Sequence, residues 1–290
     1  MIHEFKIVDV FTDRPFAGNQ LAVVLDAGGV SDARMQEVAR EFGFSETTFV
    51  SRSERAGCDW RVRIFTPTLE LPMAGHPVVG TALVLQAEGL VAERTVFELG
   101  VGPVPVEVDA QGLAWMTQPA AQLGRIHERP DLVAAALSVE PSDVRTDLPA
   151  RVVSTGNQFL MVPIASLDAV RRLRPRPDAW ERALEGFDML GFYCFSEEVE
   201  EPGASAHCRL LGGPLGTYED AATGSAAGPL GCYLWAHVHG QPQRRLDFTL
   251  EQRYEMGRPS RIRVWVPEDG KQPRVGGQAA FVAEGRIDLP

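Results

Sequence analysis

A carboxylate stands just before a run of small residues at positions 220–228, which read DAATGSAAG. Small side chains suit a turn that brings backbone N–H groups close to a ligand. A helix that starts at such a turn offers unpaired N–H donors and a partial positive charge. An anion is the natural ligand of this turn, with Asp220 at its edge. The alternative is a plain loop in which Ser225 caps the following helix.

The first half of the chain contains a similar turn. Positions 74–86 (AGHPVVGTALVLQ) resemble positions 223–235 (TGSAAGPLGCYLW). In the same order, GNQLAVV at 18–24 resembles GNQFLMV at 156–162. Two matches in one order predict a duplicated fold with two similar domains.

The duplication makes the helix starts at Gly75-His76 and at Gly224-Ser225 equivalent. We expect them to face one cleft, where their N–H groups bind a carboxylate or an enolate oxygen. The alternative is that His76 is an ordinary helix-start histidine and Ser225 a simple cap.

Glu46 is a further candidate, within GFSETTF at positions 43–49. It lies between a predicted helix end and a strand start, beside Phe44 and Phe49. Partial desolvation there would raise the pKa of the carboxyl group, as a general base and acid near neutral pH requires. The alternative is an exposed glutamate in a turn.

Strand patterns outnumber helix patterns, and this mixture indicates the α+β class. The strand-like segments are rich in β-branched and aromatic residues: FKIVDVF, QLAVVLD, TTFVSR, WRVRIFTP, VPVEVDA, FLMVPI, GFYCFS, RIRVWVP and AAFVAEGRI. Helices are expected over 31–42, 76–87, 168–173 and 178–184, and after Ser225.

The helix at 76–87 and the helix after Ser225 are apolar all round. Because they have no polar face for water, each half is expected to wrap a barrel-like sheet around its own helix. The proline-rich stretch 118–149 is the best linker candidate between the halves.

Composition excludes several classes of function. The 290 residues carry a net charge of −11 and no basic cluster typical of nucleic-acid binding. No apolar run is long enough to span a membrane, and no secretory signal is visible. The four cysteines form no CxxC pair and have no zinc-like spacing, so no metal site is expected. Reduced, mostly buried thiols in a cytoplasmic protein are the expected state.

Five motifs along nearly the whole chain resemble the phenazine-biosynthesis PhzF-like family: VDVFTDRPFAGNQLAVV, FGFSETTFV, LPMAGHPVVGTA, STGNQFLMVP and EDAATGSAAGPL, in the family's order. The resemblance implies the diaminopimelate epimerase-like fold, with two pseudo-symmetric α+β domains. We expect an N-terminal half at 1–118, a C-terminal half at 119–280, and a segment at 281–290 that packs back on the N-terminal half.

The resemblance also implies the roles of individual residues. Epimerases of this fold use two thiols, and the matching positions here, Ala74 and Thr223, cannot act as thiolate bases. The PhzF-like branch is described as using a single glutamate, which corresponds to Glu46. Ala221 stands where the family commonly has proline, a change that removes some rigidity but no functional group.

The other site residues follow from the same motifs. His76 and Asp220 match catalytic positions and would handle protons and hydrogen bonds. The matches to substrate-binding positions are Ser45, Gly75, Gly224 and Ser225. The implied reaction is an isomerisation without cofactor or metal, acting on a small-molecule carboxylate. The family's named substrate is trans-2,3-dihydro-3-hydroxyanthranilate, and a homodimer is expected by resemblance.

Alternatives to this isomerase remain open. An epimerase or a dehydratase of amino or hydroxy acids could use the same scaffold. A metabolite-binding or protein-interaction module could keep the fold without catalysis. A hydrolase triad of His76, Asp220 and Ser225 is disfavoured because GSAAG, at positions 224–228, is not the GxSxG motif.

Overall fold

The computed structural model describes residues 1–212 and 219–289 of the chain. It divides into two compact units. Unit 1 comprises residues 1–117 together with the chain from 276 onward, and unit 2 comprises residues 118–275. Within the described residues, no helix combines the length and the apolar character needed to cross a membrane.

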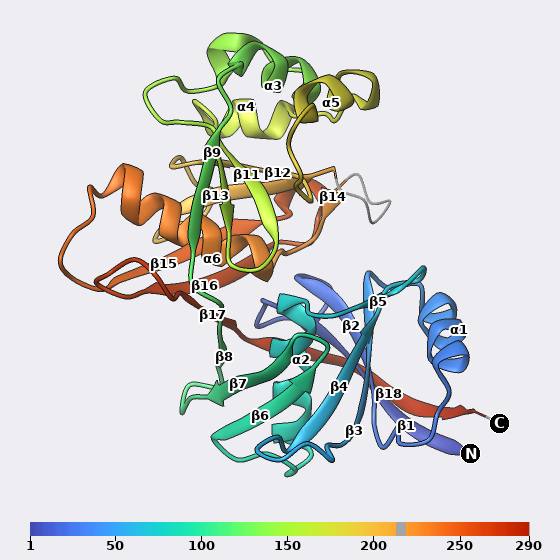
Figure 1. The fold of residues 1–290 in the computed structure, drawn as a ribbon. Coiled ribbons are helices and arrows are strands. Elements are labelled where there is room, and N and C mark those ends of the chain that lie inside the picture. Colours follow the sequence, from blue (N-terminus) through green and yellow to red (C-terminus); the bar gives the residue numbers. More distant parts are fainter. Residues whose placement is uncertain (213–218, 290) are drawn as a thin grey trace. The chain divides into compact units, whose positions relative to one another are not determined.

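Unit 1 is a sheet wrapped around one apolar helix (Figure 1). Its strands are β1 (Ile2–Val10), β2 (Asn19–Val24), β3 (Glu46–Arg52), β4 (Trp60–Phe65), β5 (Glu70–Leu71), β6 (Arg94–Leu99), β7 (Gly102–Val108), β8 (Ala114–Thr117) and β18 (Ala279–Asp288). Its helices are α1 (Asp32–Phe42) and α2 (Gly75–Ala87). Helix α2 packs against β1, β2, β3, β7 and β8, and its residues 75–85 are all buried. An apolar helix without a polar face is stable in this enclosed position.

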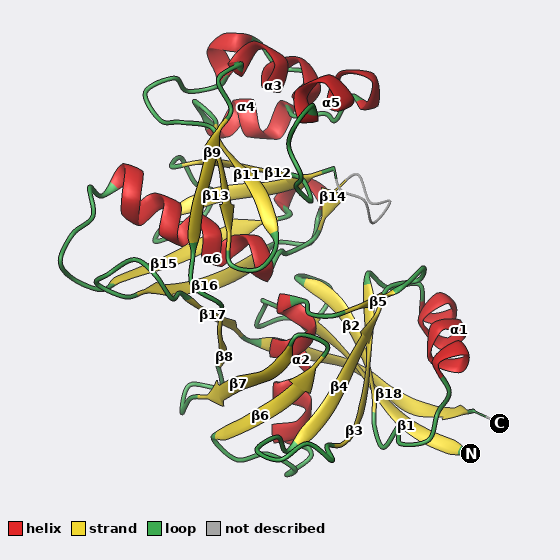
Figure 2. Ribbon diagram, viewed as in Figure 1, coloured by secondary structure: helices red, strands yellow, loops and turns green. Residues whose placement is uncertain are grey.

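Unit 2 repeats this design (Figure 2). Its strands are β9 (Gln122–Ile126), β10 (Arg151–Ser154), β11 (Gln158–Pro163), β12 (Phe192–Ser196), β13 (Ala206–Leu211), β14 (Glu219–Asp220), β15 (Leu246–Gln252), β16 (Ser260–Val266) and β17 (Arg274–Gly277), whose last two residues belong to unit 1. Its helices are α3 (Pro130–Leu137), α4 (Leu167–Arg172), α5 (Pro177–Leu184) and α6 (Gly224–Tyr233), with short turns η1 (Pro141–Asp143), η2 (Leu234–Val238) and η3 (Tyr254–Met256). Helix α6 packs on β10, β11 and β16.

The strand pairings confirm the duplication predicted from the sequence. In unit 1, β1–β2 is antiparallel, β2–β3 parallel, β3–β4 antiparallel and β4–β6 parallel. In unit 2, β10–β11, β11–β12, β12–β13 and β13–β15 follow the same sequence of directions. The short strands β5 and β14 are antiparallel partners of β4 and β13, respectively. The predicted α+β class, with a sheet around a central helix in each half, is therefore confirmed.

The unit boundaries differ from the expected ones at 118/119 and 280/281. The divisions lie at 117/118 and 275/276, so residues 276–280 leave the expected C-terminal half. The reason is β18, which starts at Ala279 and pairs with β1 along its whole length. A strand held by a full antiparallel ladder belongs to the sheet that it completes.

The expected linker at 118–149 is wrong. This stretch contains β9, α3 and η1, and α3 packs its apolar residues into the core of unit 2. Pro130 and Pro141 stand at the first positions of α3 and η1. Proline fits there, because the first residues of a helix have no intrahelical use for their N–H groups.

Local signals predicted α1 well. Ser31 accepts a hydrogen bond from the Arg34 N–H, and Gly43 ends the helix in the left-handed region, at φ 65°. Serine before the first turn and glycine after the last are common signals of helix ends, and both flank or bound the helix expected over 31–42.

Gly18 fixes the turn that precedes β2. Its φ is 59°, and a Cβ added there would lie 2.2 Å from the Val10 carbonyl oxygen. We expect Gly18→Ala to lower the free energy of unfolding by about 3 kcal/mol, because left-handed strain and a clash with backbone add together. Gly29→Ala is the matched control, since Gly29 has φ 85° and open space around its Cβ. Urea denaturation of the two variants checks this, and equal losses would contradict it.

A buried charged cluster supports the region of β13 and β14 in unit 2. The His207 ring lies between two carboxylates, with Nδ1 2.8 Å from Glu251 Oε1 and Nε2 2.8 Å from Glu255 Oε1. Next to it on β13, Arg209 donates two hydrogen bonds of 2.8 Å to the two carboxylate oxygens of Glu219. Since Glu219 forms β14 with Asp220, this cluster anchors a predicted site residue.

The charge on His207 makes stability depend on pH. Burial opposes the charge, but hydrogen bonds to Glu251 and Glu255 outweigh it and raise the pKa of His207 to about 9. The stabilisation that charged His207 gives to the folded state is fully present below the unfolded-state pKa of 6.5, and it is lost as pH rises through about 9. We expect the free energy of unfolding to fall by about 2 kcal/mol between pH 6.5 and 8.5.

Urea denaturation across this pH range measures the effect. Glu255→Gln is the comparison variant, because it removes one of the two carboxylates that raise the pKa of His207. Its stability should fall less steeply with pH than that of the wild type. Parallel pH profiles would show that His207 is not the group responsible.

Candidate active site

In unit 1 the predicted residues Glu46 and His76 lie together. Glu46 is the first residue of β3, and His76 is the second residue of α2. His76 Nε2 is 3.3 Å from Glu46 Oε2, and both residues are buried, with 4% and 8% of their surfaces exposed. The expected desolvation of Glu46 is therefore present in the structure. A buried carboxylate with a ring nitrogen beside it can take up and return a proton.

Asn19 joins this pair to Ser45. The Ser45 hydroxyl donates to Asn19 Oδ1 at 3.0 Å, and Asn19 Nδ2 is 3.2 Å from His76 Nδ1. Sequence reasoning used Asn19 only as part of the repeated GNQ motif and did not place it in the site. The repeat was the available signal, but the contact itself links residues 57 positions apart.

In unit 2 the turn before α6 is built around Asp220. Its Oδ2 accepts a 2.6 Å hydrogen bond from the Thr223 hydroxyl, and its Oδ1 accepts one from the Ala221 N–H at 2.8 Å. Gly224 and Ser225 are the first two residues of α6, and Ser225 is half-buried. Their N–H groups have no acceptor within the helix, as at any helix start. The sequence prediction of a small-residue turn that opens a helix is thus confirmed.

Two glutamines, absent from the sequence prediction, hold this turn in place. Gln252 on β15 accepts from the Thr223 N–H at 3.1 Å and donates to the carbonyl oxygen of Asp220 at 3.0 Å. Gln118 donates to the carbonyl oxygen of Gly224 at 2.9 Å. Both side chains are fully buried, so the helix start is rigidly supported. The sequence contained no local signal for either contact.

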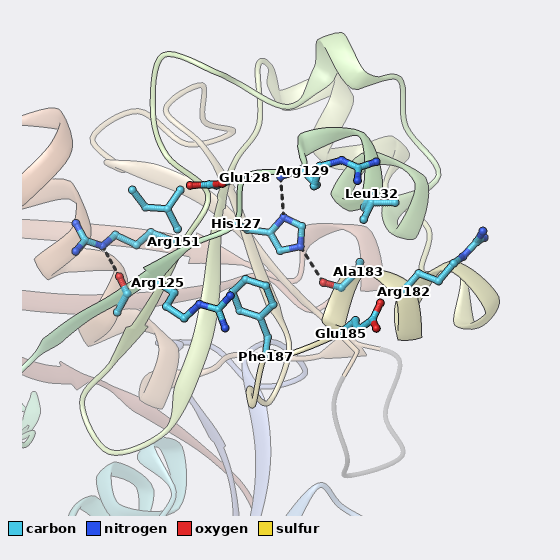
Figure 3. A pocket seen from close by; sticks show the side chains of 12 residues that line it. Arg125, His127, Glu128, Arg129, Leu132, Arg151, Arg182, Ala183, Glu185 and Phe187 are labelled. Atoms are coloured by element: carbon cyan, nitrogen blue, oxygen red, sulfur yellow. Dashed lines mark hydrogen bonds between the residues drawn. The ribbon is translucent and has the colours of Figure 1, made fainter.

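A separate cavity of about 630 Å³ lies in unit 2 beside β9, the start of α3 and the end of α5 (Figure 3). Four arginines are among its lining residues: Arg125, Arg129, Arg151 and Arg182. Arg151 donates to the carbonyl oxygens of Leu123 and Gly124, and Arg125 lies over the Phe187 ring. No predicted site residue is among the described residues that line this cavity. The chemistry-bearing residues therefore lie elsewhere, at the starts of β3, α2 and α6.

Comparison with known proteins gives the family. The model of the phenazine biosynthesis-like (PhzC-PhzF) family matches residues 8–285. The chain belongs to this family. The resemblance deduced from the five motifs is confirmed.

Individual relatives agree with this assignment. The chain is 36% identical to a trans-2,3-dihydro-3-hydroxyanthranilate isomerase from Pseudomonas aeruginosa, over 99% of this chain and 100% of the relative. A crystal structure of a PhzF-family phenazine biosynthesis protein from Bacillus anthracis matches all of both chains, with a TM-score of 0.92 and 29% identity. A hydroxyproline epimerase from Agrobacterium vitis, at 12% identity and a TM-score of 0.64, shares the fold. This PhzC-PhzF family member is an isomerase.

The positions that would carry two thiols in an epimerase of this fold are the N-caps of the central helices. They are Ala74 before α2 and Thr223 before α6. Three of the four cysteines of the chain, Cys194, Cys208 and Cys232, are buried elsewhere in unit 2, and Cys58 is half-buried in unit 1. Burial raises the pKa of the Cys232 thiol to about 12, far from the range of a reactive thiolate.

Proposed function

We propose that this PhzC-PhzF family member isomerises a small unsaturated amino or hydroxy acid. A single carboxylate, that of Glu46, removes a proton from one carbon of the substrate and returns it to another. The substrate class is that of trans-2,3-dihydro-3-hydroxyanthranilate, which names the Pseudomonas aeruginosa relative. The proposal requires neither a cofactor nor a metal.

The asymmetry between the two units carries the proposal. In unit 1, Ala22 pairs with Thr47 and Leu21 pairs with Glu46. In unit 2, Leu160, which corresponds to Ala22 in the repeated GNQ motif, pairs with Phe192. The residue that corresponds to Glu46 is therefore Gly191, which has no side chain to titrate. Only one carboxylate stands at this pair of equivalent positions, which supports a mechanism in which a single base both removes and returns the proton.

The transfer balances without another reactant. The Glu46 carboxylate takes a proton from a carbon next to the unsaturated system, and the electron pair of that C–H bond moves into the conjugated system. The protonated carboxyl group then gives the proton to a different carbon of that system. One double bond migrates, and no atom is gained or lost. A buried base near the substrate makes both steps effectively intramolecular.

The other predicted residues bind the substrate in this proposal. His76 donates a hydrogen bond, and Asp220 accepts one from an amine or a hydroxyl group. Gly75 in unit 1, and Gly224 and Ser225 in unit 2, offer N–H groups of the kind that binds a carboxylate or an oxyanion, as helix starts do. Ser45 acts through Asn19, to which it donates its hydroxyl hydrogen.

Incubation with trans-2,3-dihydro-3-hydroxyanthranilate in D₂O, followed by NMR, tests the proposal. We expect an isomer with a displaced double bond and partial deuterium at the carbon that receives the proton. An inverted stereocentre with the same connectivity would indicate an epimerase, and loss of water a dehydratase. No turnover and no shift in melting temperature with this acid or related cyclic amino acids would contradict the proposal.

A homodimer and a cytoplasmic location stay predictions. Sedimentation analysis of the purified chain measures the first, and fractionation of the native cells measures the second. Neither outcome alters the proposed chemistry of Glu46.

A further inference from the structure

The contacts of Asn19 determine where the His76 ring carries its proton. Asn19 is the first residue of β2 and is 2% exposed. Its Oδ1 faces the Ser45 hydroxyl at 3.0 Å, and its Nδ2 faces His76 Nδ1 at 3.2 Å. A side-chain NH₂ group can only donate hydrogen bonds. His76 Nδ1 therefore presents a lone pair to Asn19, and the ring proton resides on Nε2.

The opposite side of the ring leads to the same assignment. His76 Nε2 is 3.3 Å from Glu46 Oε2. The two atoms form no hydrogen bond in the structure, but a negatively charged carboxylate at this distance attracts an N–H at Nε2 and repels a lone pair there. If the Asn19 amide were reversed, Nδ1 would carry the proton and the Nε2 lone pair would face the carboxylate. That arrangement is repulsive for a neutral ring beside a carboxylate, so the orientation found in the structure is the one that suits a neutral His76.

The backbone holds Asn19 firmly in this role. Asn19 pairs with Val10 in the β1–β2 ladder, and Gly18 before it occupies the left-handed turn that only glycine fits. The backbone therefore fixes where the Asn19 side chain lies, between Ser45 and His76, although a reversed amide would keep a contact with Ser45 because a hydroxyl group can also accept.

We propose that Asn19 is a positioning residue that fixes the Nε2–H tautomer of His76 and keeps its ring neutral. A proton on Nδ1 would point at the Asn19 NH₂ group, so two hydrogen-bond donors would face each other. With Nδ1 occupied, His76 acts as a hydrogen-bond donor and does not compete with Glu46 for the substrate proton. This consequence for catalysis rests on the proposed function, whereas the tautomer does not.

The test is ¹⁵N NMR of the histidine rings in the complete chain at neutral pH, with His76→Gln used to assign the signal. In the wild type we expect a protonated Nε2 and a bare Nδ1. A wild-type spectrum with the proton on Nδ1, or on both nitrogens, overturns the proposal. This measurement needs no variant of Asn19 and no substrate.

Asn19→Asp reverses the polarity of the contact. The carboxylate can only accept, so the proton should move to Nδ1 or the ring should become an imidazolium, and kcat should fall about 10²-fold with a smaller change in KM. Asn157→Asp is the matched control, since Asn157 is the counterpart of Asn19 in the repeat and is half-buried in unit 2. The control should keep both the His76 spectrum and the turnover of the wild type.

The two readouts separate the two proposals. An unchanged Nε2–H signal in folded Asn19→Asp overturns the role of Asn19, whatever the turnover. The expected spectra without any turnover of cyclic amino acids would leave the tautomer established and remove the proposed function instead.

Discussion

Replacing Glu46 with glutamine is expected to lower kcat by about 10⁴-fold and to abolish deuterium exchange at substrate carbon. The amide is nearly isosteric, and its Oε1 can face His76 Nε2 as the Glu46 carboxylate does at 3.3 Å, so the fold and the site geometry should persist. What is lost is the group that takes and returns the proton. NMR of product formation and exchange in D₂O measures both effects on one sample.

Glu41→Gln is the matched control, because Glu41 is an exposed glutamate on α1 in the same unit. It should retain the turnover of the wild type. A folded Glu46→Gln variant with turnover within tenfold of the wild type would remove Glu46 from the mechanism. Persisting exchange would point instead to His76 as the base, which also contradicts the tautomer assigned to its ring.

The parts of the fold that were predictable from sequence are those with local causes. Helix α1 follows from its apolar spacing, the Ser31 cap and the Gly43 terminator. The burial of α2 and α6 follows from their lack of a polar face. The linker at 118–149 was mispredicted because prolines were interpreted as breaks, although Pro130 starts a helix. The same residue type has opposite meanings at the first turn and in the interior of a helix.

In the candidate site, too, only the features with local causes could be predicted from the sequence. Glu46, His76 and the small-residue turns could be singled out by residue type and motif. Asn19 and Gln252 could not, because their importance depends on contacts between strands and helices distant in the chain. A single sequence shows which groups can do chemistry more readily than it shows which groups orient them.

The largest effect on stability is expected at Arg209, which is 3% exposed on β13. Its Nε and one terminal nitrogen bind both oxygens of Glu219, and its other terminal nitrogen donates to the carbonyl oxygens of Val170 and Leu173. Arg209→Met would leave a partly buried carboxylate and two carbonyl groups without these donors. We expect the free energy of unfolding to fall by about 4 kcal/mol, as for other broken buried ion pairs. Urea denaturation at pH 7 measures the change.

A double variant distinguishes the loss of attraction between Arg209 and Glu219 from the cost of leaving the Glu219 carboxylate without its partner. If the cost of Arg209→Met comes mainly from leaving Glu219 unpaired, then adding Glu219→Leu should restore part of the lost stability. Arg245→Met serves as the control, because Arg245 is an exposed arginine whose ion pair with Asp247 lies at the surface, and its loss should cost less than about 1 kcal/mol. A double variant less stable than Arg209→Met alone would mean that Glu219 stabilises β14 without Arg209.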